Sequence, residues 1–500
     1  MRRALDSLFF VVAALVLAGT AFAAEPPALA IVVGDQTPLR PAPRDSAKPH
    51  ALLWQGEALE VRGERMDYLQ VYDHRLERGG FVSARSVRRV GTQEAAAPEL
   101  LAVIRFLRET PGSEALGIAY CALYIQAASA QALRGEEGAE ALDALGTFAE
   151  RLARRASSGA AASKAAQAAL SGHLEIAMGY GVAFTSLERE SRMVICYDGD
   201  AFRRLVDLGR GDSLQRAHAV LALTRADCLD GDLKPTERRA ADEARAELLE
   251  AVDVSALPLY VRNRVHMRRA AVWNSLAFHN ARRGEPAQSA AARALQELAR
   301  VDRHELTDED KRLYADAAMR VNASRWAALP VKPPAPAARA ERPRLVLAKG
   351  QPGETCVLLV DARHEPGNEL AKRCTYGIVW EDSATLNREG NALAVAVQNT
   401  EAWREMWVFR RSGKSWRVAS LPPAAINPGV GYAEFAGWVP GGKQVLVARE
   451  ASGDGKYRRS YELMSLDTLS TLNAVTDPQL LPVFQRWQDA SWKQASLSLR

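Results

Sequence analysis

The stretch of residues 434–466 has the most position-specific pattern in the chain, and it limits this region to antiparallel β structure. Residues 438–442 read WVPGG, which is a turn signal, and residues 444–448 read QVLVA, an apolar run too short for a helix. A second turn signal at residues 453–455 precedes another apolar segment at residues 461–463. This order of turns and short apolar runs predicts paired antiparallel strands.

A similar pattern occurs earlier in the same region. Residues 390–396 align with residues 442–448 at an offset of 52, and residues 406–409 correspond to residues 461–464. An internal repeat of about 50 residues is typical of β-propeller blades. The repeats resemble the blades of TolB-like and WD40-like propellers, and this likeness implies a fold without implying an activity. Residues 344–500 have room for about three blades, so the resemblance implies an incomplete, propeller-like antiparallel β domain.

Residues 28–91 predict another β-rich domain, a small barrel. Short apolar runs alternate with turn-forming residues, and residues 68–72 alternate polar and apolar side chains with the period of a strand. The expected strands are residues 30–33, 51–54, 58–61, 68–72 and 80–82.

The barrel segment resembles the bacterial SH3-like family. The matching segments are residues 39–40 (LR), 55–57 (QGE), 68–71 (YLQV) and 80–82 (GFV), which stand where that family has its N-V-R strand, its K-G turn, its W-x-x-V strand and the G-W-V that ends the domain. The segment departs from the family at residues 41–43 (PAP), and it has Tyr and Phe in place of two Trp. Some members of the family bind cell-wall peptides or proteins, and this resemblance implies a ligand groove. Trp54, Tyr68 and Tyr72 are the candidate groove residues, with core packing as the alternative for all three.

Residues 98–329 lose the strand pattern and are rich in Ala, Leu, Arg and Glu, which favour helices. Leu145, Phe148 and Leu152 recur at helical spacing, and Gly and Pro breaks divide the region into helices of about ten to twenty-five residues. Residues 272–298 resemble a tetratricopeptide (TPR) unit. The sequence therefore predicts a TPR-like α-helical array, whose stacked helix pairs would offer a concave surface to a partner peptide. A Pro- and Ala-rich connector, residues 330–343, separates this array from the propeller-like region.

Residues 1–23 have the features of a cleavable signal peptide. Arg2 and Arg3 precede an apolar core at residues 8–17, and residues 21–23 (AFA) match a cleavage pattern of small residues. Later stretches are too short or too polar to cross a bilayer. We therefore expect a periplasmic protein whose mature chain has no transmembrane segment.

The five cysteines of an exported chain are expected to be disulfide partners first. Cys356 and Cys374 flank a polar turn between two strand-like segments, and Cys196 and Cys228 form the other local pair. Sequence proximity favours these pairings and leaves the others open. Cys121 lies in an apolar helical segment and is expected to be a small buried side chain.

The charge balance and the motifs limit the kinds of ligand and reaction that the sequence predicts. The 65 basic and 60 acidic residues leave a net charge of +5, too small an excess to predict nucleic-acid binding. A basic cluster surrounds His266, and it is interpreted either as a solvated helix face or as a site for an anionic partner. Its members are Arg262, Arg264, Arg268 and Arg269. The sequence contains no motif for a nucleophile, a nucleotide or a metal, so we predict no catalytic, cofactor-binding or metal-binding residue and no cofactor.

The combined expectation is a multidomain α and β protein with a small SH3-like β-barrel, an α-helical array and a C-terminal propeller-like β domain. Modules of these types commonly bind peptides or proteins. The expected function is that of an exported, non-catalytic envelope protein that binds a protein, peptide or peptidoglycan partner. The alternative is a cell-envelope hydrolase with an SH3-like targeting module.

Overall fold

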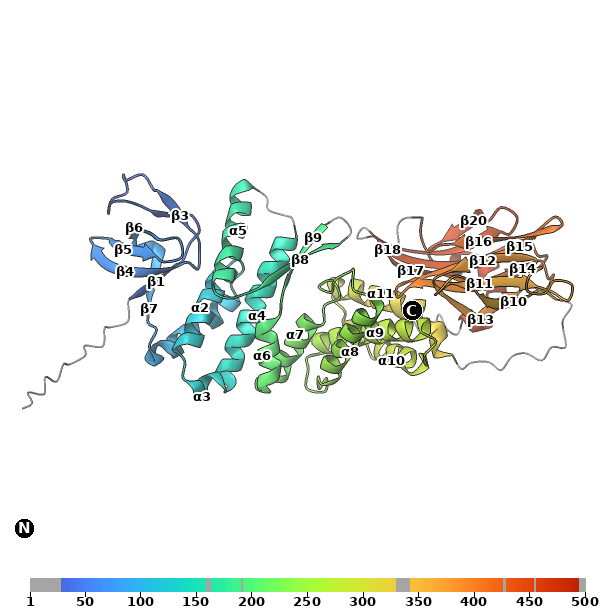
Figure 1. Cartoon of the computed structure of the whole chain (residues 1–500), viewed down its shortest axis with the longest axis horizontal. Coiled ribbons are helices and arrows are strands. Elements are labelled where there is room, and N and C mark those ends of the chain that lie inside the picture. The colour runs from blue at the N-terminus through green and yellow to red at the C-terminus, as the bar shows by residue number, and fades with distance from the viewer. Residues whose placement is uncertain are drawn as a thin grey trace, which may run out of the picture. The chain divides into compact units, whose positions relative to one another are not determined.

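The computed structural model describes residues 28–158, 163–189, 192–329, 342–425, 429–453 and 456–493 (Figure 1). The expected signal peptide, residues 1–23, and residues 330–341 of the expected connector lie outside the described residues. The chain divides into two compact units. The first comprises Met1–Ala130 with Ala160–Gly181, and the second comprises Gln131–Gly159 with Val182–Arg500. Among the described helices, none has both the length and the apolar character needed to cross a membrane.

The first unit contains a five-stranded antiparallel sheet with the strand order β6-β5-β4-β1-β7, and a separate pair, β2-β3. The strands are β1 (Leu29–Val32), β2 (Thr37–Leu39), β3 (Ala51–Leu53), β4 (Ala58–Arg65), β5 (Tyr68–Asp73), β6 (Arg78–Ser83) and β7 (Val87–Val90). The five strands expected from the sequence are confirmed as β1, β3, β4, β5 and β6. Strands β2 and β7 were not among these five, because Pro38 in β2 and Arg88 and Arg89 in β7 interrupt the apolar runs, although the family resemblance placed a strand at residues 39–40.

Three helices belong to the same unit as this sheet. They are α1 (Ala97–Arg108), α2 (Glu114–Ala127) and α5 (Lys164–Gly179), with short 3-10 turns η1 (Ala84–Ser86) and η2 (Glu94–Ala96). Helix α5 packs at Gly172 against Trp54, in the loop between β3 and β4, and an added Cβ would lie 2.7 Å from the Trp54 ring. The His173 ring lies 2.7 Å from Asp35 Oδ1, and the Tyr180 hydroxyl donates to the carbonyl of Gly56. Cys121 in α2 is fully buried and unpaired, as expected.

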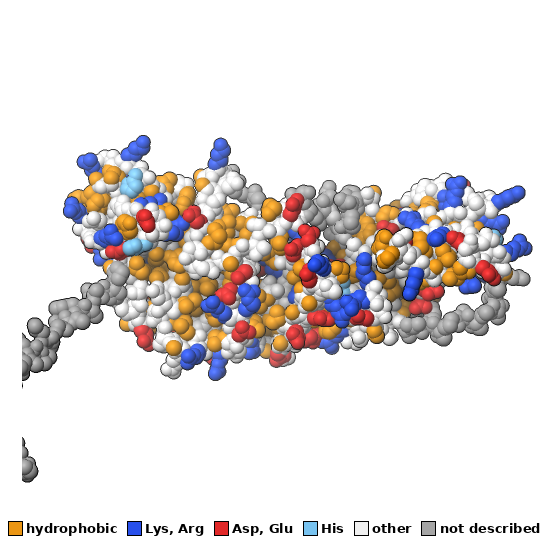
Figure 2. Space-filling model, viewed as in Figure 1, with side chains coloured by type: hydrophobic (Ala, Val, Ile, Leu, Met, Phe, Trp, Pro, Cys, Tyr) orange, Lys and Arg blue, Asp and Glu red, His pale blue; other side chains and the backbone are white. Residues whose placement is uncertain are grey.

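The second unit begins with a set of helices, and two of them end just before Gly209 and Gly284, at breaks expected from the sequence. They are α4 (Glu136–Ser157), α6 (Asp200–Leu208), α7 (Ser213–Leu223), α8 (Pro235–Glu250), α9 (Leu259–Arg282), α10 (Gln288–Ala299), η3 (Arg303–Glu305), α11 (Asp308–Ala323) and η4 (Arg325–Ala328). The short helix α3 (Ala130–Leu133) precedes them. Gly284, between α9 and α10, has a φ of +72°, a left-handed conformation that Gly adopts without strain. Basic and acidic side chains lie beside one another over these helices on the face drawn in Figure 2.

The expectation that residues 98–329 contain no strands is wrong. Strands β8 (Phe184–Arg189) and β9 (Arg192–Tyr197) form an antiparallel hairpin within this region (Figure 1). Residues 193–197 read MVICY, which is rich in β-branched and aromatic side chains and too short for a helix. The abundance of Ala and Glu on both sides obscured this short signal.

Gly146 permits close packing between two helices of the second unit. A Cβ at Gly146 in α4 would lie 2.5 Å from the ring of Phe202 in α6, and that ring is buried. Gly146→Ala should therefore lower the stability by about 1–3 kcal/mol through overpacking. Thermal unfolding measures the change. Gly179→Ala in α5 is the matched control, because its Cβ would meet no atom closer than 3.7 Å and Ala favours helix. Equal unfolding temperatures for both variants would contradict the prediction.

Residues 344–475 of the second unit form antiparallel sheets (Figure 1, orange to red). A three-stranded sheet contains β10 (Arg344–Lys349), β11 (Thr355–Val360) and β12 (Ala371–Thr375). An eight-stranded sheet contains β13 (Ile378–Leu386), β14 (Ala392–Thr400), β15 (Trp403–Ser412), β16 (Ser415–Leu421), β17 (Val430–Val439), β18 (Gln444–Gly453), β19 (Lys456–Ser465) and β20 (Thr471–Val475). Two short helical segments follow, η5 (Pro478–Leu480) and α12 (Pro482–Trp487).

The strands expected from the repeat are confirmed. Strands β14 and β15 pair in the same way as β18 and β19, and the two groups β13–β16 and β17–β20 each run antiparallel. A short parallel contact between β15 and β17 joins the two groups into one sheet. Ala392 and Ala394 of β14 pack toward β17 and β18, whereas Leu393 and Val395 pack toward β10 and β11. Because both faces of β14 are buried, its sequence is a continuous apolar run.

Both expected disulfides are present. Cys356 and Cys374 are directly opposed in the register of β11 and β12, and Cys196 of β9 pairs with Cys228 in the loop between α7 and α8. Each bond closes a loop within the second unit.

Candidate functional site: an arginine-lined cavity

The second unit contains a cavity of about 780 Å³ whose wall includes parts of α4, α7, α8, α9 and α11. Helix α9 contributes Arg264, Arg268 and Ser275, and helix α4 contributes Arg151 and Arg154. Spacings of three, four and seven residues keep such side chains on one face of a helix. This spacing is the sequence pattern from which the cavity-lining side chains of α4 and α9 could have been predicted.

Basic side chains dominate the wall. Nine arginines and five carboxylates line the cavity, an excess of four positive charges. The arginines are Arg151, Arg154, Arg189, Arg225, Arg238, Arg245, Arg264, Arg268 and Arg320, and the carboxylates are Glu150, Asp227, Glu309, Asp316 and Glu401. Charges in a concave, partly enclosed site are less screened by solvent than charges on an open surface. The excess therefore favours the entry of an anion.

Arg268 is one of two arginines of the wall, with Arg189, that form no ion pair among the described residues. Its Nη1 donates to the carbonyl of Leu221 at 3.1 Å and to the Thr224 hydroxyl at 3.3 Å, and among the described residues it forms no ion pair. Burial by the surrounding protein, together with the positive charge of Arg245, lowers the pKa of Arg268 to about 10. The guanidinium is still charged at neutral pH, and an anion in the cavity would stabilise it.

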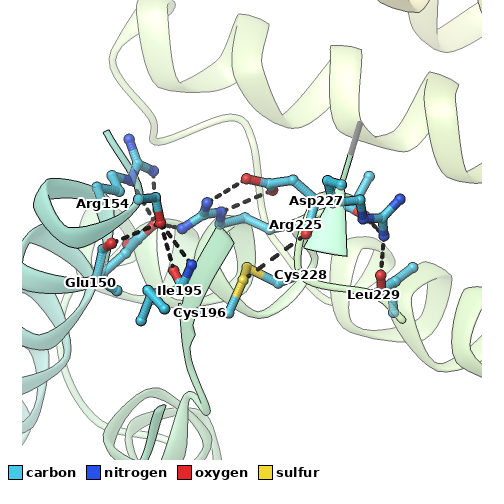
Figure 3. The surroundings of a disulfide bond; sticks show 12 residues. Glu150, Arg154, Ile195, Cys196, Arg225, Asp227, Cys228 and Leu229 are labelled. Carbon is cyan, nitrogen blue, oxygen red and sulfur yellow. Dashed lines mark hydrogen bonds and ion pairs between the residues drawn. A yellow bond between two sulfur atoms is a disulfide. The ribbon is translucent and has the colours of Figure 1, made fainter. Parts of the chain in front are cut away.

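Arg225 lies between two carboxylates beside the disulfide (Figure 3). Its Nε donates to Asp227 Oδ1 at 3.1 Å, and its Nη1 lies 3.3 Å from Glu150 Oε1. Burial opposes the charge on Arg225, but Asp227 and Glu150 outweigh burial and raise the pKa of Arg225. Asp227 directly precedes Cys228, whose bond to Cys196 ties this loop to β9. The disulfide thus helps to hold one edge of the cavity in place.

Glu401 brings the sheet into contact with the helices at another edge. This residue lies in the turn between β14 and β15, and its carboxylate accepts from Arg238 Nη2 at 3.0 Å, Arg320 Nη1 at 3.4 Å and Ser275 Oγ at 2.7 Å. Burial opposes ionisation of Glu401, but the positive charges of Arg238 and Arg320 outweigh burial and lower the pKa of Glu401. Glu401 therefore stays ionised and ties the turn to α8, α9 and α11.

Asp242, His279 and Glu401 are the described residues best arranged to hold a metal ion, with their ligand atoms within 4.8 Å of one another. However, Arg245 Nη1 lies 2.5 Å from Asp242 Oδ1, and Arg238 contacts both carboxylates. These guanidinium groups already offset the negative charge that a divalent ion would need. The donor set therefore fits an ion-pair network better than a metal centre. In a second group, Glu354 lies near Cys356 and Cys374, whose sulfur atoms form the disulfide.

The basic cluster expected from the sequence is divided among different environments. Arg264 and Arg268 line the cavity, whereas Arg262 is absent from its wall. Arg269 is buried and donates to carbonyl oxygens at the end of α8, and the buried His266 ring lies 2.6 Å from a carboxylate oxygen of Glu297 in α10. The solvated-face interpretation is therefore wrong for Arg269 and His266. The residues diverge because successive positions on a helix are separated by about 100°.

The expected groove residues of the first unit have separate surroundings. Trp54 packs against Gly172 of α5, and Tyr68 is buried and donates its hydroxyl to Asp45. The ring of Tyr72 lies 3.9 Å below the guanidinium of Arg62. None of these contacts joins the three side chains to one another, and the groove stays a prediction.

The chain matches no protein-family model, no curated protein and no solved structure.

Proposed function

We propose that this chain is an exported, non-catalytic protein of the bacterial periplasm that binds an anionic group of a protein, peptide or peptidoglycan partner in the arginine-lined cavity. The observation that carries the proposal is the excess of four positive charges around one cavity, with Arg268 left without an ion-pair partner among the described residues. Arginine is well suited to this task because its planar guanidinium binds carboxylate and phosphate groups through two parallel hydrogen bonds.

The sequence modules are part of the same proposal. Residues 28–91 are proposed as an SH3-like module, residues 98–329 as a TPR-like helical array and residues 344–500 as a propeller-like β domain. The signal-peptide pattern in the sequence of residues 1–23 and the disulfides support the proposal of delivery to an oxidising compartment. In this proposal the SH3-like module makes a separate contact with the cell wall or with a partner.

The hydrolase alternative has one arrangement in its favour, the proximity of Ser275, His279 and Asp242. In serine hydrolases the histidine lies between the serine and the carboxylate. Here Asp242 lies between the other two, since its Oδ2 is 2.6 Å from Ser275 Oγ and 4.0 Å from His279 Nε2. Burial also lowers the pKa of His279. This order does not supply a histidine base to the serine, and it favours binding over hydrolysis as the function of this region.

Isothermal titration with a tetraglutamate peptide tests the proposal. The peptide should bind, its affinity should fall as salt is added, and Arg268→Met should raise the Kd about tenfold, because a charge-assisted hydrogen bond has about this effect. Arg262→Met is the matched control, since it removes the same side chain from the same helix outside the cavity wall. A tetraglutamine peptide that binds equally well, or an Arg268→Met variant that binds as the parent does, would refute the proposal.

A further inference from the structure

A second cavity in the same unit has the opposite charge character. It encloses about 640 Å³ between the sheet and the helical segments α10 and η4, and its wall includes Leu295, Trp326, Met406 and Phe435. Pockets of about 300–1,000 Å³ with mostly apolar walls and a few polar groups are typical of sites for small ligands. The dimensions and the wall therefore suit a ligand with an apolar chain.

The polar groups of this pocket leave negative charge uncompensated. Glu434 is matched, because its carboxylate lies 2.8 Å from Arg404 Nη2 and 3.3 Å from Arg325 Nη2. Asp382 and Asp489 also line the pocket, and neither forms an ion pair with any residue that the structure describes. Asp489 Oδ1 accepts only local hydrogen bonds from residues 491 and 492. The pocket thus offers two carboxylates to a positively charged ligand.

A bulge in β13 exposes one of these carboxylates. The register between β13 and β14 shifts between Trp380 and Thr385, so that residues 381–384 project from the regular pairing. Ser383 fastens the bulge to the sheet, because its hydroxyl donates to the carbonyl of Trp380 and accepts from the backbone N–H of Ala396. Bulges of this kind direct side chains out of a sheet and are frequent beside functional sites. Asp382 is held at the pocket in this way and remains exposed.

The positive charge in the wall of this pocket is already compensated. Arg325 lines the pocket, with its guanidinium 4.9 Å from the centre of the Trp326 ring and 3.3 Å from Glu434 Oε2. The indole N–H of Trp326 is buried and has no hydrogen-bond partner among the described residues. A buried polar group without a partner is rare in folded proteins, and a carbonyl group of a bound ligand would provide one after a small rotation of the ring.

We propose that this pocket binds an alkylammonium group, with Asp382 and Asp489 compensating its charge and with Trp326 and Phe435 covering its alkyl chain. The group belongs either to a lysine side chain of a polypeptide or to a free diamine. The site is independent of the arginine-lined cavity, and the two pockets select ligands of opposite charge.

Saturation-transfer NMR with three probes tests the proposal on the full mature chain. N-acetyl-lysine methylamide should bind at least about tenfold more tightly than N-acetyl-norleucine methylamide, which has the same apolar chain without the charge. Cadaverine is the third probe. Binding of cadaverine as tight as that of the lysine derivative supports the free diamine as the ligand, and weaker binding supports the lysine side chain.

Two variants locate the binding. Asp382→Asn should weaken the lysine derivative about tenfold without changing thermal unfolding, because Asp382 is exposed. Arg268→Met, in the other cavity, should leave this binding unchanged, so failure here is distinguishable from failure of the proposed anion site. Equal affinities for the lysine and norleucine derivatives, or an unchanged affinity in Asp382→Asn, would overturn the proposal.

Discussion

Replacing Arg404 with Met is expected to lower the free energy of unfolding of the second unit by about 3–5 kcal/mol, because it leaves a buried charge without its main partner. Arg404 is completely buried, and Glu434 is only 4% exposed. Nη2 of Arg404 donates to Glu434 at 2.8 Å, and Nη1 donates to the carbonyl of Asn322 at 2.7 Å, near the end of α11. The substitution therefore removes a charge partner and a link between helix and sheet. Arg325 stays beside Glu434, so we expect the lower end of this range.

Chemical denaturation followed by circular dichroism measures this effect. Arg411→Met is the control, because Arg411 lies on the same strand and is exposed, and surface substitutions change stability by about 0.5 kcal/mol or less. Adding Glu434→Gln to Arg404→Met should restore part of the lost stability, since it removes the carboxylate that has lost its nearest charge partner. If Arg404→Met unfolds at the same denaturant concentration as the parent, the buried pair does not stabilise this unit.

Removing the Cys196–Cys228 disulfide is expected to lower stability by about 3–4 kcal/mol. The two cysteines are separated by 32 positions in the sequence, and in the chain-entropy model a loop of this length gives a stabilisation of about that size. The double variant Cys196→Ser/Cys228→Ser should also weaken binding of the tetraglutamate peptide, because the bond holds the loop that carries Arg225 and Asp227 at the cavity (Figure 3).

Unfolding with and without a reducing agent checks the second prediction. Reduction should destabilise the parent protein more than the double variant, which retains only the Cys356–Cys374 bond. Cys121→Ala is the control, because this cysteine forms no disulfide, and burial raises the pKa of its thiol and keeps it unreactive. The prediction fails if the double variant and the parent have the same stability under oxidising conditions.

Local patterns predicted much of the secondary structure. The turn signals around residues 444–448 and 461–463 identified β18 and β19, because a strand bounded by Gly and Pro depends on few distant contacts. The pairing of Cys356 with Cys374 followed from their positions on either side of a short polar turn. The β8–β9 hairpin was missed because hydrophobic periodicity is judged over a stretch as long as a helix. Over such a stretch, the surrounding Ala-rich residues outnumber the short β-branched segment.

Most of the residues that line the candidate sites could not be predicted from the sequence. The basic cluster on α9 was visible in the sequence, but its division into cavity-lining Arg264 and Arg268 and structural Arg269 depends on which neighbours pack on each face of the helix. The contacts of Glu401 with Arg238 and Arg320 join residues 163 and 81 positions apart. Contacts between residues so far apart in the sequence leave no periodic pattern from which they could be predicted.

The sequence by itself determined most of the strands of the two β-rich regions, the helical character of most of the region between them, and which cysteines are near enough along the chain to pair. These properties depend on backbone preferences and on side-chain periodicity, which act over a few residues. Only the tertiary structure decided that arginines from α4, α8, α9 and α11 surround one cavity, while carboxylates from a β-bulge and the C-terminal segment line another. The physical reason is that burial and charge compensation depend on the packing of distant segments, and this packing sets the charge of each pocket.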